Sequence, residues 1–171
     1  MQVIIADIDG TVLDVAGRTA ACLREIGLEF DDPLAVSRTL RGDDNRRFYE
    51  LFLGTKYIDL DTPMPRVIEQ LRALIEETKL PLIYLSGRLT NVERPTRKAL
   101  EAIGLPFEAL ALRPYRYRFK RATEWKVIAI REVGYEPVHI FDDDADVLKA
   151  LGAAFPGALL HDVSEAPPAP L

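Results

Sequence analysis

Val3-Ile4-Ile5-Ala6-Asp7-Ile8-Asp9-Gly10-Thr11 decides the fold of this chain: an apolar run that ends in two carboxylates and a Gly-Thr turn. The apolar run is typical of a strand that is buried on both faces. Residues two apart in a strand project to the same side, so we expect the side chains of Asp7 and Asp9 to converge. Like charges so close together require a cation, a shared proton or phosphate chemistry. The alternative, that Asp7 caps a helix or turn and Asp9 is only a turn residue, is disfavoured because later stretches supply matching parts.

The composition is that of an ordinary globular chain. Its 171 residues, 48% hydrophobic and 29% charged, suffice for one packed domain with a small appendage. A net charge of -5 gives no general attraction to nucleic acid or to an anionic membrane, so a polyanion contact requires a local basic patch. A single cysteine, Cys22, excludes an intrachain disulfide, and we expect it to be buried in a helix. Without a secretory signal or a membrane span, we expect a cytoplasmic protein with no membrane contact and no obligate protein partner; its oligomeric state stays open.

Apolar runs alternate with helical patterns along the rest of the chain. This alternation predicts a doubly wound, Rossmann-like α/β fold, with a parallel sheet between helices. The expected strands cover 3–6, 81–85, 108–112, 138–141 and 158–160. Four helices are expected between them: one that starts within 61–65, one after residue 88, one over 122–133 and one that includes 148–151.

The stretch from 18 to 54 has a different character, with short helix-like groups and no strand pattern. We interpret it as a small helical cap inserted into a core domain made of 1–17 and 55–165. The proline-rich end, 166–171, is predicted to be a flexible tail.

Polar residues gather where the predicted strands end. They are Asp7 and Asp9 after the first strand, Ser86 after the second, Arg113 after the third, and Asp142 and Asp143 after the fourth. Open parallel sheets bind ligands outside the carboxyl ends of their strands. Carboxylates without nearby His or Cys favour Mg²⁺, and a carboxylate beside a metal-bound phosphate can act as a nucleophile. The sequence therefore predicts a phosphoryl-transfer site at this edge.

These motifs resemble those of the haloacid dehalogenase-like phosphohydrolases. The family's Asp-x-Asp-Gly-Thr motif, its hydroxyl residue after a strand, its lysine near a helix start and its acidic pair occur here in order, across residues 3–147. The matching residues are Asp7 to Thr11, Ser86 followed by Gly87 and Arg88, Lys126 with Lys120 as the competing choice, and Asp142-Asp143.

The resemblance implies a role for each residue. Asp7 would attack phosphorus and bind Mg²⁺, while Asp9 would bind Mg²⁺ through its backbone carbonyl and serve as general acid and base, with a raised pKa. The implied phosphate-binding residues are Thr11, Ser86, Gly87, Arg88 and Lys126. Asp142 and Asp143 would complete the metal shell; which of the two ligates directly stays open. For Arg88, pairing with an acidic neighbour is the alternative.

The expected function is that of a Mg²⁺-dependent phosphatase working through an aspartyl-phosphate. A looser similarity, over 61–65, 85–88 and 112–114, links the chain to phosphatase domains of polynucleotide kinase-phosphatases and their RNA-repair-like relatives. The substrate is thus a nucleotide or a nucleic-acid terminal phosphate, or alternatively a sugar or organic-acid phosphate. A non-catalytic phosphoryl-binding or receiver-like domain is disfavoured, because a receiver has its acidic pair at its first strand and every catalytic position is filled here.

Basic and aromatic residues alternate over 113–121. In an extended chain, Arg116, Arg118 and Lys120 would share one side and the rings the other. Together with Arg113, these are candidate substrate contacts, suited to a nucleotide or nucleic-acid end. The competing interpretation is a loop whose rings cover the core and whose charges are solvated.

Overall fold

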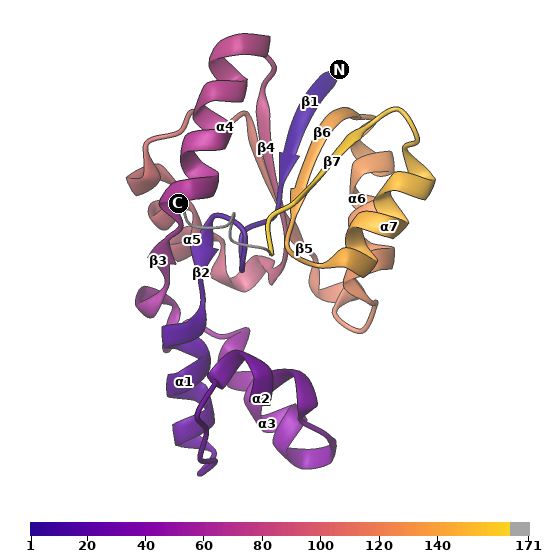
Figure 1. Ribbon diagram of the computed structural model, residues 1–171. Helices are drawn as coiled ribbons and strands as arrows, with labels where there is room; N and C mark the ends of the chain where they lie inside the picture. The colour runs from indigo at the N-terminus through magenta and orange to yellow at the C-terminus, as the bar shows by residue number, and fades with distance from the viewer. Residues whose placement is uncertain (165–171) are drawn as a thin grey trace, which may run out of the picture.

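A fully parallel five-stranded sheet forms the centre of the structure, a computed structural model that describes residues 1–164 (Figure 1). The strand order is β5-β4-β1-β6-β7, so the strand that opens the chain lies in the middle. The strands are β1 (Gln2–Ala6), β4 (Leu82–Leu89), β5 (Ala109–Arg113), β6 (Glu136–Asp142) and β7 (Leu159–Asp162). The predicted doubly wound α/β sheet is confirmed.

Helices cover both faces of the sheet (Figure 1). On one face lie α4 (Pro65–Thr78) and α5 (Glu93–Ile103), and on the other lie α6 (Ala122–Val133) and α7 (Ala145–Ala154). Alternate residues of β1 pack against the helices on opposite faces of the sheet. Ile4 and Ala6 belong to the core under α4 and α5, and Val3 and Ile5 belong to the core under α6 and α7. The unbroken apolar run of β1 is explained by this burial on both faces.

Three helices stand beyond the carboxyl ends of the strands (Figure 1). They are α1 (Ala16–Glu25), α2 (Pro33–Thr39) and α3 (Gly42–Phe52), and they share a small core of their own. That core includes Cys22, which is buried in α1 as predicted, and Phe48.

A two-stranded antiparallel ribbon, β2 (Leu13–Asp14) with β3 (Thr62–Pro63), joins the helical insertion to the sheet. The helix predicted to start within 61–65 is α4, which begins at Pro65, but the short η1 helix (Ile58–Leu60) and the strand β3 that precede it were not predicted. A ribbon of two-residue strands is too short to give a periodic pattern.

The structure also corrects two predicted segments. Strand β4 does not end at Ser86 but runs on to Leu89, with a register shift after Ser86, and leads into η2 (Thr90–Val92). Residues 113–121 are not extended: a 3₁₀ helix, η3 (Tyr115–Tyr117), and a turn follow Pro114. Between residues 1 and 164 no helix has the length and apolarity to cross a bilayer, and the tail predicted over 166–171 lies outside the described residues.

Candidate active site

Three carboxylates meet where β1 and β6 end. The backbone N–H of Asp7 donates to the carbonyl of Phe141 at 2.9 Å, which fixes the two strand ends side by side. As a result, one oxygen from each of Asp7, Asp142 and Asp143 lies within 4.8 Å of the other two. A set of oxygen donors this close suits a hard divalent cation such as Mg²⁺.

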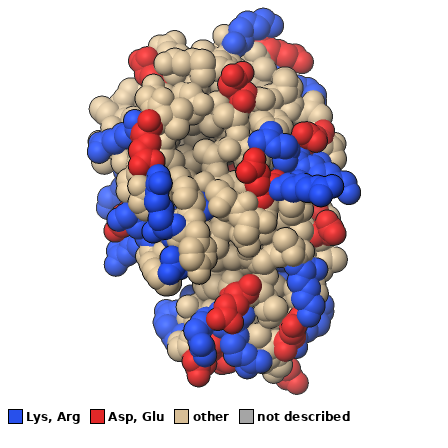
Figure 2. Space-filling model, turned by 180° about the vertical axis from the view of Figure 1, so that it is seen from behind, with Lys and Arg blue, Asp and Glu red and all other residues tan. Residues whose placement is uncertain are grey.

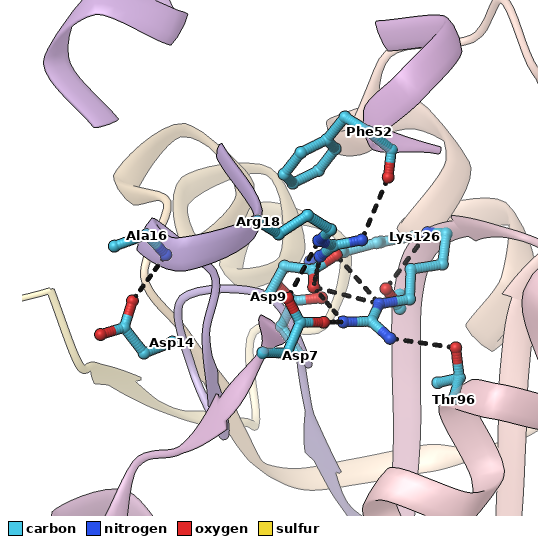
Figure 3. Close-up of polar contacts among 11 residues, drawn as sticks. Asp7, Asp9, Asp14, Ala16, Arg18, Phe52, Thr96 and Lys126 are labelled. Carbon is cyan, nitrogen blue, oxygen red and sulfur yellow. Dashed lines mark hydrogen bonds and ion pairs between the residues drawn. The ribbon is translucent and has the colours of Figure 1, made fainter. Parts of the chain in front are cut away.

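Lys126 lies beside these carboxylates. It projects from the start of α6 and is buried, with its Nζ 2.9 Å from Asp7 Oδ1 and 2.6 Å from Asp142 Oδ2 (Figure 3). The competing lysine, Lys120, is on the surface and pairs with Glu124 at 3.7 Å. The structure therefore brings Lys126, and not Lys120, to the predicted site.

The crowding of carboxylates changes their protonation. Burial raises the pKa of Asp7 to about 7, with Asp142 and Asp9 adding to the rise and Lys126 opposing it. Burial and the neighbouring Asp7 raise the pKa of Asp143 to about 6. Lys126 therefore does not offset the full negative charge of the cluster, and an additional cation would favour the ionised forms. The residues fit the magnesium ion that the sequence predicts.

Asp143 is the carboxylate with the freest oxygens. Asp142 accepts from Lys126 through Oδ2 and from the backbone N–H of Asp144 through Oδ1 at 3.0 Å. Among the side chains of residues 1–164, Thr11 alone donates to Asp143, through a long hydrogen bond of 3.4 Å. We therefore favour Asp143 as the direct metal ligand of the pair.

The turn after β1 is shaped around Asp143. Gly10 has φ 79°, and a Cβ there would overlap the Asp143 carboxylate. Thr11 is fully buried and its hydroxyl points at the same carboxylate. Thr11 was expected to bind phosphate, but its contacts are those of a residue that supports Asp143.

A cavity of about 630 Å³ opens in front of the cluster. Ser86 and Gly87 line it together with Lys126, so three of the predicted phosphate-binding residues lie at the cavity. A Cβ at Gly87 would come within 2.6 Å of Arg113 Nη2, so glycine lets this guanidinium cross above β4. Nη1 of Arg113 donates to the carbonyl of Lys120 at 3.0 Å, which ties the 113–121 segment to the rim of the site.

Asp9 points away from the metal cluster and into a buried ion-pair network (Figure 3). Its Oδ1 lies 2.6 Å from both Arg18 and Arg88, and Asp61 lies 3.0 Å from Arg18 and 2.5 Å from Arg88. Arg88 also donates to Thr96 at 3.0 Å. The donors of Arg88 thus contact Asp9, Asp61 and Thr96, as in the alternative interpretation of pairing with an acidic neighbour, and its phosphate-binding role stays a prediction.

The same two arginines shift the pKa of Asp9 in the direction opposite to the expected one. Burial acts to raise it, but the charges of Arg88 and Arg18 outweigh burial, so that the pKa of Asp9 is lowered. The prediction of a raised pKa failed because the two arginine partners were not foreseen. Arg18 comes from α1 and Asp61 from the segment directly after η1, and no local pattern in the sequence indicates that either one pairs with Asp9.

The other candidate contacts lie outside the cavity lining. Arg116 is 4.0 Å from Glu132, and the Arg118 guanidinium lies over the rings of Tyr115 and Phe119 at 4.0 and 4.2 Å. The ring of Phe119 is 86% exposed. The expectation that these rings cover the core is thus not met for Phe119.

Known structures share this fold. A haloacid dehalogenase-like hydrolase from Streptococcus pneumoniae superposes with a TM-score of 0.63 and 16% identity, covering 92% of this chain and 82% of its own. An enzyme of the same family from Bacteroides thetaiotaomicron was solved with magnesium and inorganic phosphate. It superposes with a TM-score of 0.57 and 14% identity, and the match covers 95% of this chain and 93% of that enzyme. A chain of the Pnkp1/Rnl/Hen1 complex superposes with a TM-score of 0.63 and 19% sequence identity.

This chain is similar in 95% of its length to the Pnkp1/Rnl/Hen1 chain but spans only 45% of that chain. No family model and no curated protein sequence matches it. The structural likenesses confirm the predicted resemblance at the level of the fold, which is that of the haloacid dehalogenase-like hydrolases.

Asp143→Asn should make the metal-free protein more stable and remove its response to Mg²⁺. Because the folded-state pKa values of Asp7 and Asp143 are raised, these groups stabilise the metal-free fold at low pH, and that contribution is lost as the pH rises through about 6 to 7. At pH 7.5 in EDTA we expect a Tm rise of about 2–4 °C, the shift that ~1 kcal/mol produces in a chain of this size. Differential scanning calorimetry with and without Mg²⁺ measures both effects, with exposed Asp43→Asn as the control. A variant that Mg²⁺ still stabilises as strongly as wild type would contradict this metal site.

Arg88→Met should destabilise the fold by about 3–5 kcal/mol, because it leaves the two buried carboxylates Asp9 and Asp61 with Arg18 as their one remaining arginine partner among the described residues. Urea denaturation measures the loss. Arg97→Met is the matched control, since Arg97 pairs with Glu93 at 3.3 Å on the surface and should cost less than ~1 kcal/mol. Equal losses in the two variants would refute a structural role for the network.

Proposed function

We propose that this protein is a Mg²⁺-dependent phosphomonoester hydrolase that works through an aspartyl-phosphate at Asp7. The observation that carries the proposal is the meeting of Asp7, Asp142 and Asp143 at one point, with the ammonium group of Lys126 2.9 Å from Asp7. Phosphoryl transfer needs little beyond in-line positioning and neutralisation of the charge on the transferring oxygens. At this site Asp7 would be the positioned nucleophile, and Lys126 would neutralise charge on the transferring oxygens.

Each residue has a proposed part. Asp7, Asp143 and the Asp9 backbone would hold Mg²⁺, and Asp142 would orient Lys126. When bound, the ion would neutralise charge on the phosphoryl oxygens. Ser86, the Gly87 backbone and Lys126 would bind the remaining oxygens at the cavity that they line.

Two displacements at phosphorus would complete the reaction. A carboxylate oxygen of Asp7 attacks phosphorus, the bond to the ester oxygen breaks, and Asp9 gives that oxygen a proton. Water then attacks the phosphorus of the aspartyl-phosphate, Asp9 takes a proton from it, and Asp7 and phosphate are released.

The two arginines around Asp9 oppose both proton transfers. Asp9 is ionised and has no proton to donate, and its lowered pKa makes it a weak base. Arg18 is part of α1, so we propose that 18–54 acts as a cap over the core made of 1–17 and 55–165. A movement of α1 away from Asp9 would remove one arginine and allow Asp9 to carry the proton.

A nucleotide or a nucleic-acid terminal phosphate is the proposed substrate. The support is the exposed pairing of rings and guanidinium at Tyr115, Arg118 and Phe119, next to the Arg113 that crosses Gly87. Basic and acidic side chains are interspersed over the face seen in Figure 2, so any binding site for a polyanion there would be a local one. A sugar or organic-acid phosphate is the alternative, and it would have no use for these rings.

Asp7→Asn should abolish turnover of 4-nitrophenyl phosphate in Mg²⁺ while the circular dichroism spectrum stays that of the folded wild-type protein. The substitution removes the nucleophile and keeps the shape of the side chain. Asp43→Asn, far from the cluster on the exposed side of α3, serves as the control. Turnover that survives in Asp7→Asn would refute the assignment of the nucleophile.

The double variant Arg116→Ala/Arg118→Ala tests the proposed substrate. With an oligonucleotide that carries a terminal phosphate, kcat/KM should fall by about tenfold or more, since stacking and charge are both lost. With glycerol phosphate it should stay within about twofold, because the two residues lie outside the cavity lining. An unchanged kcat/KM for the oligonucleotide would favour the small-metabolite alternative.

A further inference from the structure

A second cavity adjoins the first on the side of the helical insertion. It measures about 470 Å³, and it shares Asp9, Arg38, Asp143 and Ser164 with the cavity in front of the aspartate cluster. Ser86 and Lys126, the proposed phosphoryl ligands, line the first cavity and not the second. Because Asp9 would exchange a proton with the ester oxygen, the second cavity lies where the leaving group of the substrate would extend.

The wall of this second cavity is mostly apolar. Phe48, Tyr49 and Phe52 line it from α3, and Met64 lines it from the core side. The ring of Tyr49 meets those of Phe48 and Phe52 edge to face, with centroids 5.2 and 6.3 Å apart. Such a wall favours a leaving group with an apolar or planar body.

Arg38 is the one lysine or arginine that borders both cavities within the described residues. The other charged groups at the junction are the paired Lys126 and Asp9 and the metal-site carboxylate Asp143: Lys126 faces Asp7 and Asp142, and Asp9 faces Arg18 and Arg88. Within residues 1–164, no carboxylate lies at ion-pair distance from the Arg38 guanidinium. Arg38 is an exposed residue of α2, so its guanidinium is available to a ligand at the mouth of the two cavities.

We infer that Arg38 binds a second anionic group, carried by the leaving group of the substrate. The inference rests on the proposed function and adds a substrate class to it: phosphomonoesters whose leaving group bears a phosphate, a phosphodiester or a carboxylate. A planar guanidinium binds each of these through paired hydrogen bonds. The ester phosphate goes to the aspartate cluster, and the second anion goes to Arg38 across the mouth shared by the two cavities.

Isothermal titration calorimetry in the Asp7→Asn background, with Mg²⁺ present, separates binding from turnover. Two ligand pairs distinguish the sources of the anion: adenosine monophosphate against adenosine bisphosphate, and glycerol phosphate against phosphoglycerate. Within at least one pair, the ligand with the second anion should bind about tenfold more tightly, which is the range expected for a hydrogen-bonded charge pair. Adding Arg38→Gln should bring the two dissociation constants of that pair together.

Arg47→Gln is the matched control, because Arg47 is exposed on α3 and lines neither cavity. The Arg47→Gln variant should bind the ligand with the second anion more tightly than its partner ligand, as the protein with Arg47 does. Equal dissociation constants within both pairs, a preference that survives Arg38→Gln, or a failure of all four ligands to bind would overturn the anion subsite. Absence of turnover by wild-type protein, alongside a preference that depends on Arg38, would instead overturn the hydrolase assignment and leave the subsite standing.

Discussion

The crowding of negative charge at the ends of β1 and β6 is the constraint on which the rest of this structure depends. Asp7, Asp142 and Asp143 are brought together by strand pairing, and burial raises the pKa values of Asp7 and Asp143 to about 7 and about 6. One buried lysine offsets part of that charge. The fold thus maintains a costly arrangement whose natural complement is a divalent cation with an anionic substrate.

A second concentration of charge gives Asp9 different chemistry from Asp7, although the two are separated by one residue. Arg18 and Arg88 lower the pKa of Asp9, whereas burial raises that of Asp7. Arg18 also donates to the carbonyl of Phe52 at 3.1 Å and lies over its ring, so the network joins both ends of the helical insertion to Asp9. Closing and opening of the insertion and the protonation of Asp9 would therefore be linked.

The sequence was most informative where a pattern is local. The buried run before Asp7, the helix over 122–133 and the order of polar strand ends all predicted the sheet, and Lys126, one of two candidate lysines, lies beside the aspartates. The sequence was uninformative where partners come from distant segments: Arg18 reaches Asp9 from α1, Asp61 reaches the same arginine from the segment after η1, and Arg38 reaches the cavity from α2. The 113–121 alternation misled because Pro114 and the 3₁₀ turn at Tyr115 replace the extended backbone that alternation assumes.

The most direct test of the account is chemical identification of the phosphorylated residue. Wild-type protein turning over substrate in Mg²⁺ is quenched with acid, reduced with borohydride and analysed by peptide mass spectrometry. An aspartyl-phosphate is reduced to homoserine, so the account predicts homoserine at position 7 and at no other aspartate. Steady turnover without homoserine, or homoserine at position 9, 142 or 143, would contradict it.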